Sequence, residues 1–254
     1  MRSAKCEMNV RKRCYTAFCG CLFLSNIKPI NIVFVVAFRE VFIIAGSQMQ
    51  LPYGIIAFPS FRTSHFSFRI KQIRGDKMLY MILKDGFEET EAIATLDFIK
   101  RADIEIKTVS DKETVTGTHG VKVGVDILFS EIETDNLSGV ILPGGQPGSD
   151  NLFSCDKTKE LLEYAYKEKK LLSAICAAPY ILGERGYLKG KDATCFPGFE
   201  SHLKGANVVD KKVTTDGNVI TAKGMGASFL FGYEIVKYFK GEEASKKIME
   251  AIFY

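Results

Sequence analysis

The sequence predicts an α/β fold in which helices cover both faces of an open, mostly parallel sheet. From residue 78 onward, short apolar runs that suit buried strands alternate with longer stretches whose apolar residues recur every three or four positions. The breaks between these segments are short, as they are in domains built from strand–helix units. With no internal repeat, the 177 residues from 78 to 254 suffice for one such domain.

Strands are predicted where a short apolar run is bounded by turn signals. In chain order these runs are Leu79–Leu83, Glu105–Val109, Val140–Leu142, Leu171–Ile175 and the weaker Ala193–Cys195, Lys212–Thr215 and Val219–Ala222. Val115–Thr118 and Val121–Val125 flank His119-Gly120 and predict a hairpin.

Helices are predicted where apolar residues share one face. The clearest example is Glu88–Ala102, in which Ala92, Ile93, Leu96 and Ile99 follow the helical period. The other expected helices are Lys157–Lys169, Ala177–Glu184, Ala227–Phe239 and Glu242–Ile252. Strands and helices of these lengths, taken in turn, are what a parallel sheet with crossover helices requires.

Charge divides the chain into two parts. Residues 1–77 hold 12 Lys and Arg against 3 Asp and Glu, whereas residues 78–254 hold 22 against 27. The formal net charge of +4 therefore comes from the first part alone. The larger part lacks the basic balance on which nucleic-acid binding depends, so we expect no nucleic-acid partner. Apolar and charged fractions of 46% and 25% exclude a collagen-like or wholly disordered chain.

Residues 1–77 show no sustained helical or alternating period. Their longest apolar stretch, Ile30–Gly46, is interrupted by charge and is too short to span a membrane, so we expect no membrane partner. A secretory signal around Tyr15–Leu24 and a mitochondrial presequence are alternatives, but the first lacks a cleavage site and the second an amphipathic face. We expect a poorly ordered extension, or sequence upstream of a start at Met78.

The cysteines indicate neither a metal site nor a disulfide framework. Four lie in the first part without the spacing of a paired zinc site: Cys6, Cys14, Cys19 and Cys21. Three lie in the second part: Cys155, Cys176 and Cys195. We expect no bound metal. An odd total of seven fits a reducing compartment better than secretion, so we expect a cytoplasmic protein.

The most informative residue is Cys176, which lies between the predicted strand Leu171–Ile175 and a predicted helix. A residue at such a turn lies at the carboxyl edge of the sheet, as the nucleophile does in an elbow motif. Helix amides and the helix dipole favour a thiolate there, and Ala177 and Ala178 leave room for a substrate. The alternative is a buried cysteine that acts only as a small apolar side chain.

Two further features favour a reactive site. Gly144 and Gly145 end the strand Val140–Leu142 and leave backbone N–H groups free to stabilise an oxyanion. Glu91 lies three residues beyond Glu88 on the first helix, so its side chain can point inward. A carboxyl group held near a thiolate is expected to stay protonated and to donate a hydrogen bond.

Three ordered stretches resemble a known family. They are Asp85-Gly86-Phe87-Glu88-Glu89-Thr90-Glu91, Leu142-Pro143-Gly144-Gly145 and Ala174-Ile175-Cys176-Ala177-Ala178-Pro179. Together they resemble the DJ-1/ThiJ/PfpI superfamily, and most closely its DJ-1 branch, that of the Parkinson disease protein. Thr221–Ser228 is similar to that branch's last strand-to-helix turn. The resemblance covers about residues 78–254, and residues 1–77 have no counterpart in it.

The resemblance implies a flavodoxin-like three-layer sandwich with a mostly parallel central sheet, usually a homodimer, without a cofactor. It implies that Cys176 is the nucleophilic and redox-sensitive residue, that Glu91 hydrogen-bonds it, and that Gly145 and Ala177 supply oxyanion donors. It also places Gly144, His119 and Phe196 as possible lining of the site, although a plain hairpin-turn residue is the simpler interpretation of His119.

The activities that the resemblance implies are glyoxalase action on methylglyoxal without glutathione, deglycation of early glycation adducts, and chaperone or oxidative-stress roles. A small aldehyde or a glycated molecule would be the substrate. In this chemistry the Cys176 thiolate attacks an aldehyde, and Glu91 moves a proton between adjacent carbons on the way to a 2-hydroxy acid. Acid–base help of this kind contributes roughly 10²–10⁴ in rate.

The sequence also departs from relatives. Ala177 stands where the protease-like branch has a histidine, so a Cys-His peptidase dyad is unsupported. His202 is the only late histidine and is not part of a His-x-Glu pattern, which argues against an amidotransferase. Phe196 stands where several DJ-1 relatives have a histidine, which removes a group able to polarise a carbonyl.

Three hypotheses therefore use the same residues. The leading one is an enzyme that processes reactive carbonyls through Cys176 and Glu91. The second is a redox sensor or chaperone in which Cys176 oxidises to a sulfinic acid with little turnover. The third is a pseudoenzyme whose elbow cysteine no longer reacts. Sequence does not separate them.

Overall fold

The computed structural model describes residues 35–37, 40–42 and 77–254. The chain divides into two compact units, residues 1–68 and 69–254. In the first unit, β1 (Val35–Ala37) and β2 (Glu40–Phe42) pair in antiparallel fashion. The other expectations for residues 1–77 lie outside the described residues.

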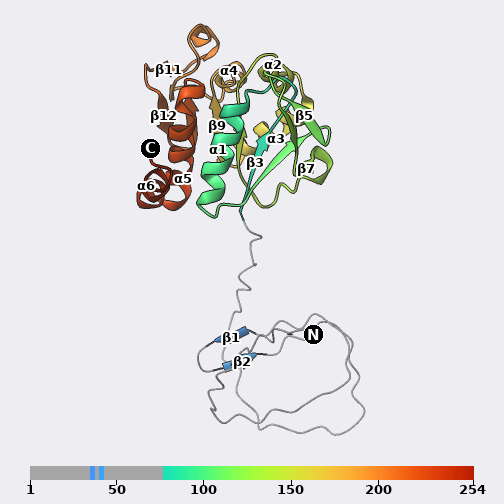
Figure 1. The fold of residues 1–254 in the computed structure, drawn as a ribbon, viewed down its shortest axis with the longest axis vertical. Helices are drawn as coiled ribbons and strands as arrows, with labels where there is room; N and C mark the ends of the chain where they lie inside the picture. The colour runs from blue at the N-terminus through green and yellow to red at the C-terminus, as the bar shows by residue number, and fades with distance from the viewer. Residues whose placement is uncertain (1–34, 38–39, 43–76) are drawn as a thin grey trace, which may run out of the picture. The chain divides into compact units, whose positions relative to one another are not determined.

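The second unit is built on a seven-stranded sheet (Figure 1). The strands in spatial order are β12 (Val213–Asp216), β13 (Val219–Ala222), β9 (Leu171–Ile175), β8 (Leu137–Leu142), β3 (Met78–Ile82), β4 (Ile106–Ser110) and β7 (Ile127–Leu128). Neighbouring strands run parallel except β12 and β13, which are antiparallel. The sheet is therefore mostly parallel, as predicted, with an antiparallel strand at one edge.

Helices cover both faces of this sheet and make three layers (Figure 1). One face is covered by α1 (Glu89–Arg101), α5 (Ser228–Lys240) and α6 (Glu242–Ala251). The other is covered by α2 (Gly148–Phe153), α3 (Asp156–Lys167) and α4 (Pro179–Glu184). Because strand side chains alternate, Leu79 and Met81 join the first core while Tyr80 and Ile82 join the second. The strands β3, β9 and β13 are thus buried on both faces, which explains their mainly apolar sequences.

Shorter elements surround the sheet. The predicted hairpin is present as β5 (Thr114–Thr116) and β6 (Lys122–Gly124), and β10 (Asp192–Ala193) pairs with β11 (Asn207–Val208) outside the main sheet. Single turns of 3-10 helix occur at Phe129–Glu131, Glu200–His202 and Met225–Ala227. No helix in the described part of the chain is long and apolar enough to cross a membrane.

Two boundaries differ from the prediction in ways that affect the site. The helix expected over Ala177–Glu184 begins only at Pro179, which suits the first helical position because its missing N–H needs no partner there. The one-turn helix α2 is not predicted, because it is short, opens with a glycine and buries only one large apolar side chain, Leu152.

Candidate active site

Cys176 occupies a sharp elbow at the carboxyl edge of the sheet. It directly follows β9 and has a φ of +65°, a left-handed backbone conformation that residues other than glycine rarely adopt. Its N–H donates to the Ala222 carbonyl at 2.9 Å, and its carbonyl accepts from the Phe196 N–H at 2.7 Å. Such a conformation costs about 1–3 kcal/mol and persists only where neighbours hold it. Backbone hydrogen bonds on both sides of Cys176 do so here.

Gly144 borders both Cys176 and Glu91. A Cβ at position 144 would lie 2.5 Å from the Cys176 Cβ and 2.6 Å from Glu91 Oε2. Only glycine therefore lets the loop after β8 pass this close to the two side chains. Its N–H donates to Glu91 Oε2 at 2.8 Å, so the same residue also fixes the carboxyl group. The three motifs that were separate in the sequence thus meet at one point.

Glu91 is a buried carboxyl group with 1% of its surface exposed. The capping hydrogen bond from the Glu91 N–H to Glu88 Oε2, at 2.6 Å, starts α1 so that the Glu91 side chain turns inward. Its Oε1 is buried without a hydrogen-bond partner. Burial raises the pKa of Glu91 to about 7, against the lowering effect of hydrogen bonds from Cys176 and Gly144. A carboxyl group that is half protonated near neutral pH can both give and take a proton.

The Cys176 thiol and the Glu91 carboxyl group each affect the pKa of the other. Burial, followed by the charge of the Glu91 carboxylate and a hydrogen bond to it, raises the pKa of Cys176 to about 12. Protonation of Glu91 removes the repulsion and turns the carboxylate into a donor, so the thiolate becomes easier to form. Above about pH 7 the pair therefore holds one proton between two groups. In that state the Glu91 carboxylate carries the charge, and transfer of the thiol proton to it forms the Cys176 thiolate.

Two backbone donors face the sulfur. Hydrogen bonds from the N–H groups of Ala177 and Gly145 lower the pKa of Cys176. Within the described residues, neither N–H has a carbonyl or side-chain oxygen as a partner. The structure therefore brings the expected oxyanion donors, Gly145 and Ala177, to the thiol. They lower the Cys176 pKa by less than burial and Glu91 raise it, so the net shift is upward.

The helix dipole contributes less than the sequence suggests. Because α4 begins at Pro179 and has six residues, Cys176 lies before the helix rather than in its first turn. Direct N–H donors, not the dipole, are what favours negative charge on the sulfur.

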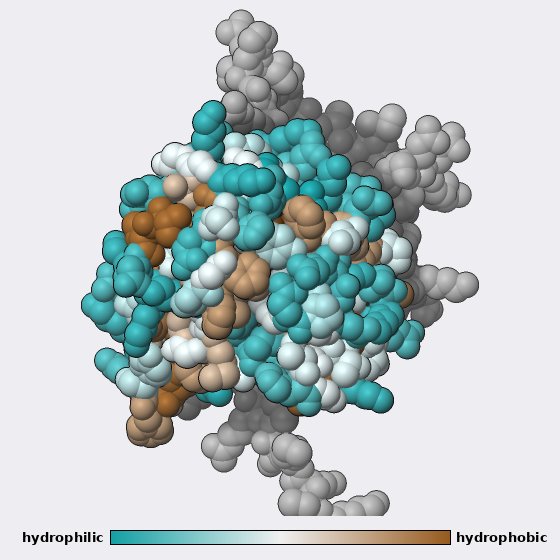
Figure 2. Space-filling view, turned by 90° about the horizontal axis from the view of Figure 1, so that it is seen from above, coloured by the Kyte–Doolittle hydropathy of each residue, from teal (hydrophilic) through white to brown (hydrophobic). Residues whose placement is uncertain are grey.

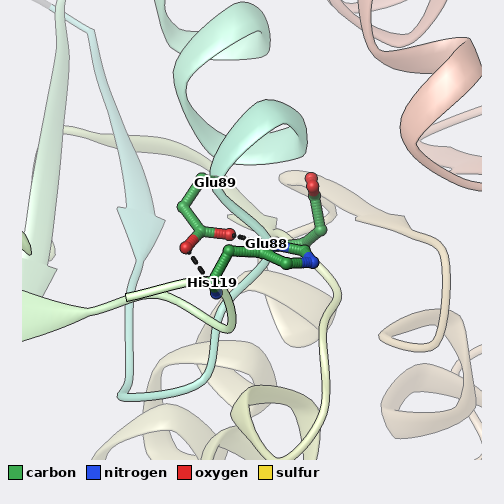
Figure 3. Close-up of side chains that lie close together, drawn as sticks. All are labelled: Glu88, Glu89 and His119. Atoms are coloured by element: carbon green, nitrogen blue, oxygen red, sulfur yellow. Dashed lines mark hydrogen bonds and ion pairs between the residues drawn. The ribbon is translucent and has the colours of Figure 1, made fainter. Parts of the chain in front are cut away.

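His119 pairs with Glu89 at the start of α1 (Figure 3). Its Nδ1 lies 2.9 Å from Glu89 Oε2, and its backbone N–H donates to Glu89 Oε1 at 2.7 Å. The pKa of His119 is raised by Glu89, and its side chain is 72% exposed. The pair ties the β5–β6 hairpin to the start of α1, two residues from Glu91.

Glu88, Glu89 and His119 also offer ligand atoms within 4.8 Å of one another, a spacing that a metal ion can bridge (Figure 3). Both carboxylates already have partners, however. Glu88 caps α1, and Glu89 holds the hairpin. This arrangement explains the three residues as structural supports without a metal.

Phe196 does reach the site. A Cβ at Gly224 would lie 3.4 Å from Phe196 Cδ2 and 3.9 Å from Cys176 Sγ, so ring and sulfur border the same space. Beyond this point a shallow hollow of about 440 Å³ opens, lined by residues that include Phe196, Gly224 and Met225. The sequence alone predicts no role for Gly224 and Met225. They lie in the turn after β13, and only the pairing of β13 with β9 brings that turn beside Cys176.

The comparisons with known proteins agree with this architecture. The model of the DJ-1/PfpI family matches residues 77–238. Protein DJ-1 homolog B of Arabidopsis thaliana is 34% identical over 180 residues, which cover 70% of this chain and 41% of that protein. Protein dj-1beta of Drosophila melanogaster is 31% identical over 180 residues, which cover 69% of this chain and 96% of that protein.

The chain belongs to the DJ-1/PfpI family. The crystal structure of Drosophila melanogaster DJ-1beta matches with a TM-score of 0.67 and 30% identity, over 70% of this chain and 98% of that one. Deglycase PfpI of Pyrococcus furiosus is 30% identical over 167 residues, which cover 65% of this chain and 99% of that protein. The family thus includes proteins named for deglycase activity. The chain spans less than half the length of the two Arabidopsis relatives.

Proposed function

We propose that this DJ-1/PfpI family member is a cysteine-dependent enzyme that processes reactive carbonyls, with Cys176 as nucleophile and Glu91 as acid–base group. One observation carries the proposal. A thiol and a carboxyl group with a pKa raised to about 7 lie together beside Gly144, with two N–H donors at the sulfur. The name of the Pyrococcus furiosus relative, a deglycase, supports the same class of substrate.

The reaction follows from the position of the shared proton. As the Cys176 sulfur attacks the aldehyde carbon of an α-oxoaldehyde, a C–S bond forms and the carbonyl oxygen gains negative charge. The N–H groups of Gly145 and Ala177 lie beside the sulfur and stabilise this oxygen. Protonation of the oxygen gives a hemithioacetal. No second nucleophile is needed for this step.

Glu91 then moves a proton. As a carboxylate it removes the proton from the former aldehyde carbon, and as an acid it returns a proton to the adjacent carbon. The product is a thioester of a 2-hydroxy acid. Water cleaves the thioester, releases the acid and restores the thiol, so the net change is addition of one water to the substrate. For methylglyoxal the product is lactate.

A peptidase mechanism lacks its base. Both histidines in the described domain are bound to carboxylates away from the sulfur, His119 to Glu89 and His202 to Glu184. Glu91 is therefore the titratable side chain available to the Cys176 thiol.

The experiment is lactate production from methylglyoxal without glutathione, using the full chain. Wild type is compared with Cys176→Ala and with the matched control Cys195→Ala, which removes a buried cysteine outside the proton pair. The proposal predicts turnover in wild type and the control and none in Cys176→Ala. Wild type no faster than Cys176→Ala would remove the proposal.

Redox sensing is the second candidate, because the same N–H donors and a protonated Glu91 suit the oxygens of a cysteine sulfinic acid. Peroxide treatment followed by mass spectrometry of the Cys176 peptide tests it. A stable gain of two oxygens in a protein without carbonyl turnover would favour the sensor.

A further inference from the structure

A shallow hollow lies beside Gly224, and a Cβ at Gly224 would lie 3.9 Å from Cys176 Sγ. Its volume is about 440 Å³, and its lining includes Phe196, Pro197, Gly224 and Met225, with Lys212 and Lys223 at the side. Figure 2 looks down on the end of the domain that bears the carboxyl ends of the strands, and shows brown patches in a mainly teal surface. The apolar side chains exposed on this face are therefore confined to a few patches.

Phe196 and Met225 leave unusual apolar area uncovered at this place. Phe196 is 47% exposed and Met225 is 56% exposed. Exposed apolar side chains are ordinary when they are scattered. These two line one hollow, and the Phe196 ring and the Cys176 sulfur border the same space beside Gly224.

The position of Phe196 is fixed by the backbone. Its N–H donates to the Cys176 carbonyl at 2.7 Å, which holds the backbone of Phe196 next to that of Cys176. A group attached to the carbonyl that Cys176 attacks would therefore lie near the ring. A methyl group would leave most of the hollow filled with water, whereas an aromatic ring would cover Phe196 and Met225.

The lysines are a weaker basis for selection. The Lys223 ammonium already forms an ion pair with Asp210, and surface charges of this kind are screened by solvent. An anionic substituent is therefore the competing possibility and serves as one outcome of the test.

We propose that Phe196 and Met225 form a specificity site that selects α-oxoaldehydes with an aromatic or similarly bulky apolar substituent over methylglyoxal. This inference rests on the proposed attack by Cys176. Phenylglyoxal is then expected to have a kcat/KM at least about tenfold that of methylglyoxal, since apolar pockets discriminate by about 10–200-fold. The step itself is unchanged: a C–S bond forms, one water is added, and a 2-hydroxy acid leaves.

The first test compares kcat/KM for the two aldehydes in wild type, Phe196→Ala, Met225→Ala and the control Phe229→Ala. Phe229 is an exposed phenylalanine that does not line the hollow. The preference is expected to fall about tenfold in Phe196→Ala, less in Met225→Ala and not in the control. A wild-type ratio near one, or a ratio unaffected by Phe196→Ala, overturns the inference.

A second readout separates failure of the inference from failure of the proposed function. Alkylation of Cys176 by phenacyl chloride and by chloroacetone is followed by mass spectrometry, and each rate is divided by that of free glutathione. The corrected ratio is expected to favour phenacyl chloride about tenfold in wild type and to approach one in Phe196→Ala, even if no aldehyde is turned over. If wild type shows no aromatic preference, the hollow has another role. If wild type instead prefers iodoacetate over iodoacetamide, the hollow selects anions.

Discussion

Glu89 and Glu91 lie two residues apart at the start of α1, and the structure treats them in opposite ways. Glu89 accepts hydrogen bonds from His119, which outweigh its partial burial and lower its pKa. Glu91 is buried beside a thiol and has one oxygen without a partner, and its pKa is raised to about 7. The same residue type on the same helical turn is a structural anchor at one position and a candidate acid–base group at the other.

The difference teaches that acidic residues in a first helical turn cannot be interpreted from the helix alone. The helix dipole favours the charged form of both. The two residues differ in the partner that the rest of the fold supplies. Glu89 accepts a hydrogen bond from the backbone N–H of His119, whereas Glu91 lies beside Cys176 and accepts from the N–H of Gly144. The predictions below test this contrast.

A large loss of activity is expected from Gly144→Ala, which leaves both reacting groups in place. Its Cβ would overlap both Cys176 and Glu91, so the two groups must separate. Displacement of reacting groups by about an ångström costs on the order of 10² in rate. Carbonyl turnover should therefore fall at least about 100-fold. Gly124→Ala is the matched control, because its Cβ would meet only the Glu113 carbonyl oxygen, at an ordinary 3.8 Å, and Gly124 lies in the hairpin strand β6. Equal activity in the two variants would contradict the account of Gly144.

Glu91→Gln should lower carbonyl turnover by roughly 10²–10⁴, the usual contribution of a positioned acid–base group. Glu89→Gln should leave most activity intact, because Glu89 contacts the hairpin and not the thiol. Steady-state kinetics of the two variants measure this contrast. A similar loss in both would mean that the start of α1 acts as one structural unit.

Glu91→Gln should also make the protein more stable at alkaline pH. A carboxyl group with a pKa near 7 in the folded chain and 4.5 when unfolded binds its proton more tightly in the folded state. Stability then falls as pH rises from about 4.5 to 7 and stays lower above that range. Urea unfolding at pH 8 should show a gain of about 1–3 kcal/mol. At pH 4 the gain should vanish, and persistence of the gain there would refute the linkage.

His119→Ala should have the smallest effect. The histidine is exposed, and Glu89 keeps hydrogen bonds from the hairpin backbone when the ring is removed. Turnover should stay within about twofold of wild type, as for most surface substitutions. The pKa of Glu89, followed by NMR titration, should rise toward its ordinary value. A large loss of activity would place His119 in the reaction.

The sequence predicts the sheet well because its strands are buried on both faces. Leu171–Ile175 and Val219–Ala222 begin and end where the apolar runs do. The start of α4 is set by Pro179, whose backbone preference outweighs the small residues before it. The one-turn helix α2 has too few apolar residues to produce a helical period.

The residues of the site were predictable from the sequence, whereas the pKa values of Cys176 and Glu91 were not. The motifs name Cys176, Glu91 and Gly145, and the fold places them together. A pattern of residues does not reveal how deeply a side chain is buried, so the sequence does not predict that burial, followed by Glu91, raises the Cys176 pKa. Nor does it show that the turn at Gly224 and Met225 borders the thiol, since that depends on which strand lies beside β9.

The central claim is that Cys176 and Glu91 share one proton near neutral pH. The most direct test is the pH dependence of Cys176 alkylation by iodoacetamide in wild type and Glu91→Gln. The account predicts a wild-type rate that rises with an apparent pKa near 7, where the pair loses its first proton. In Glu91→Gln no carboxyl group titrates near 7, so this inflection should disappear and the rate should rise only where the buried thiol itself ionises. Profiles that coincide in the two proteins would contradict it.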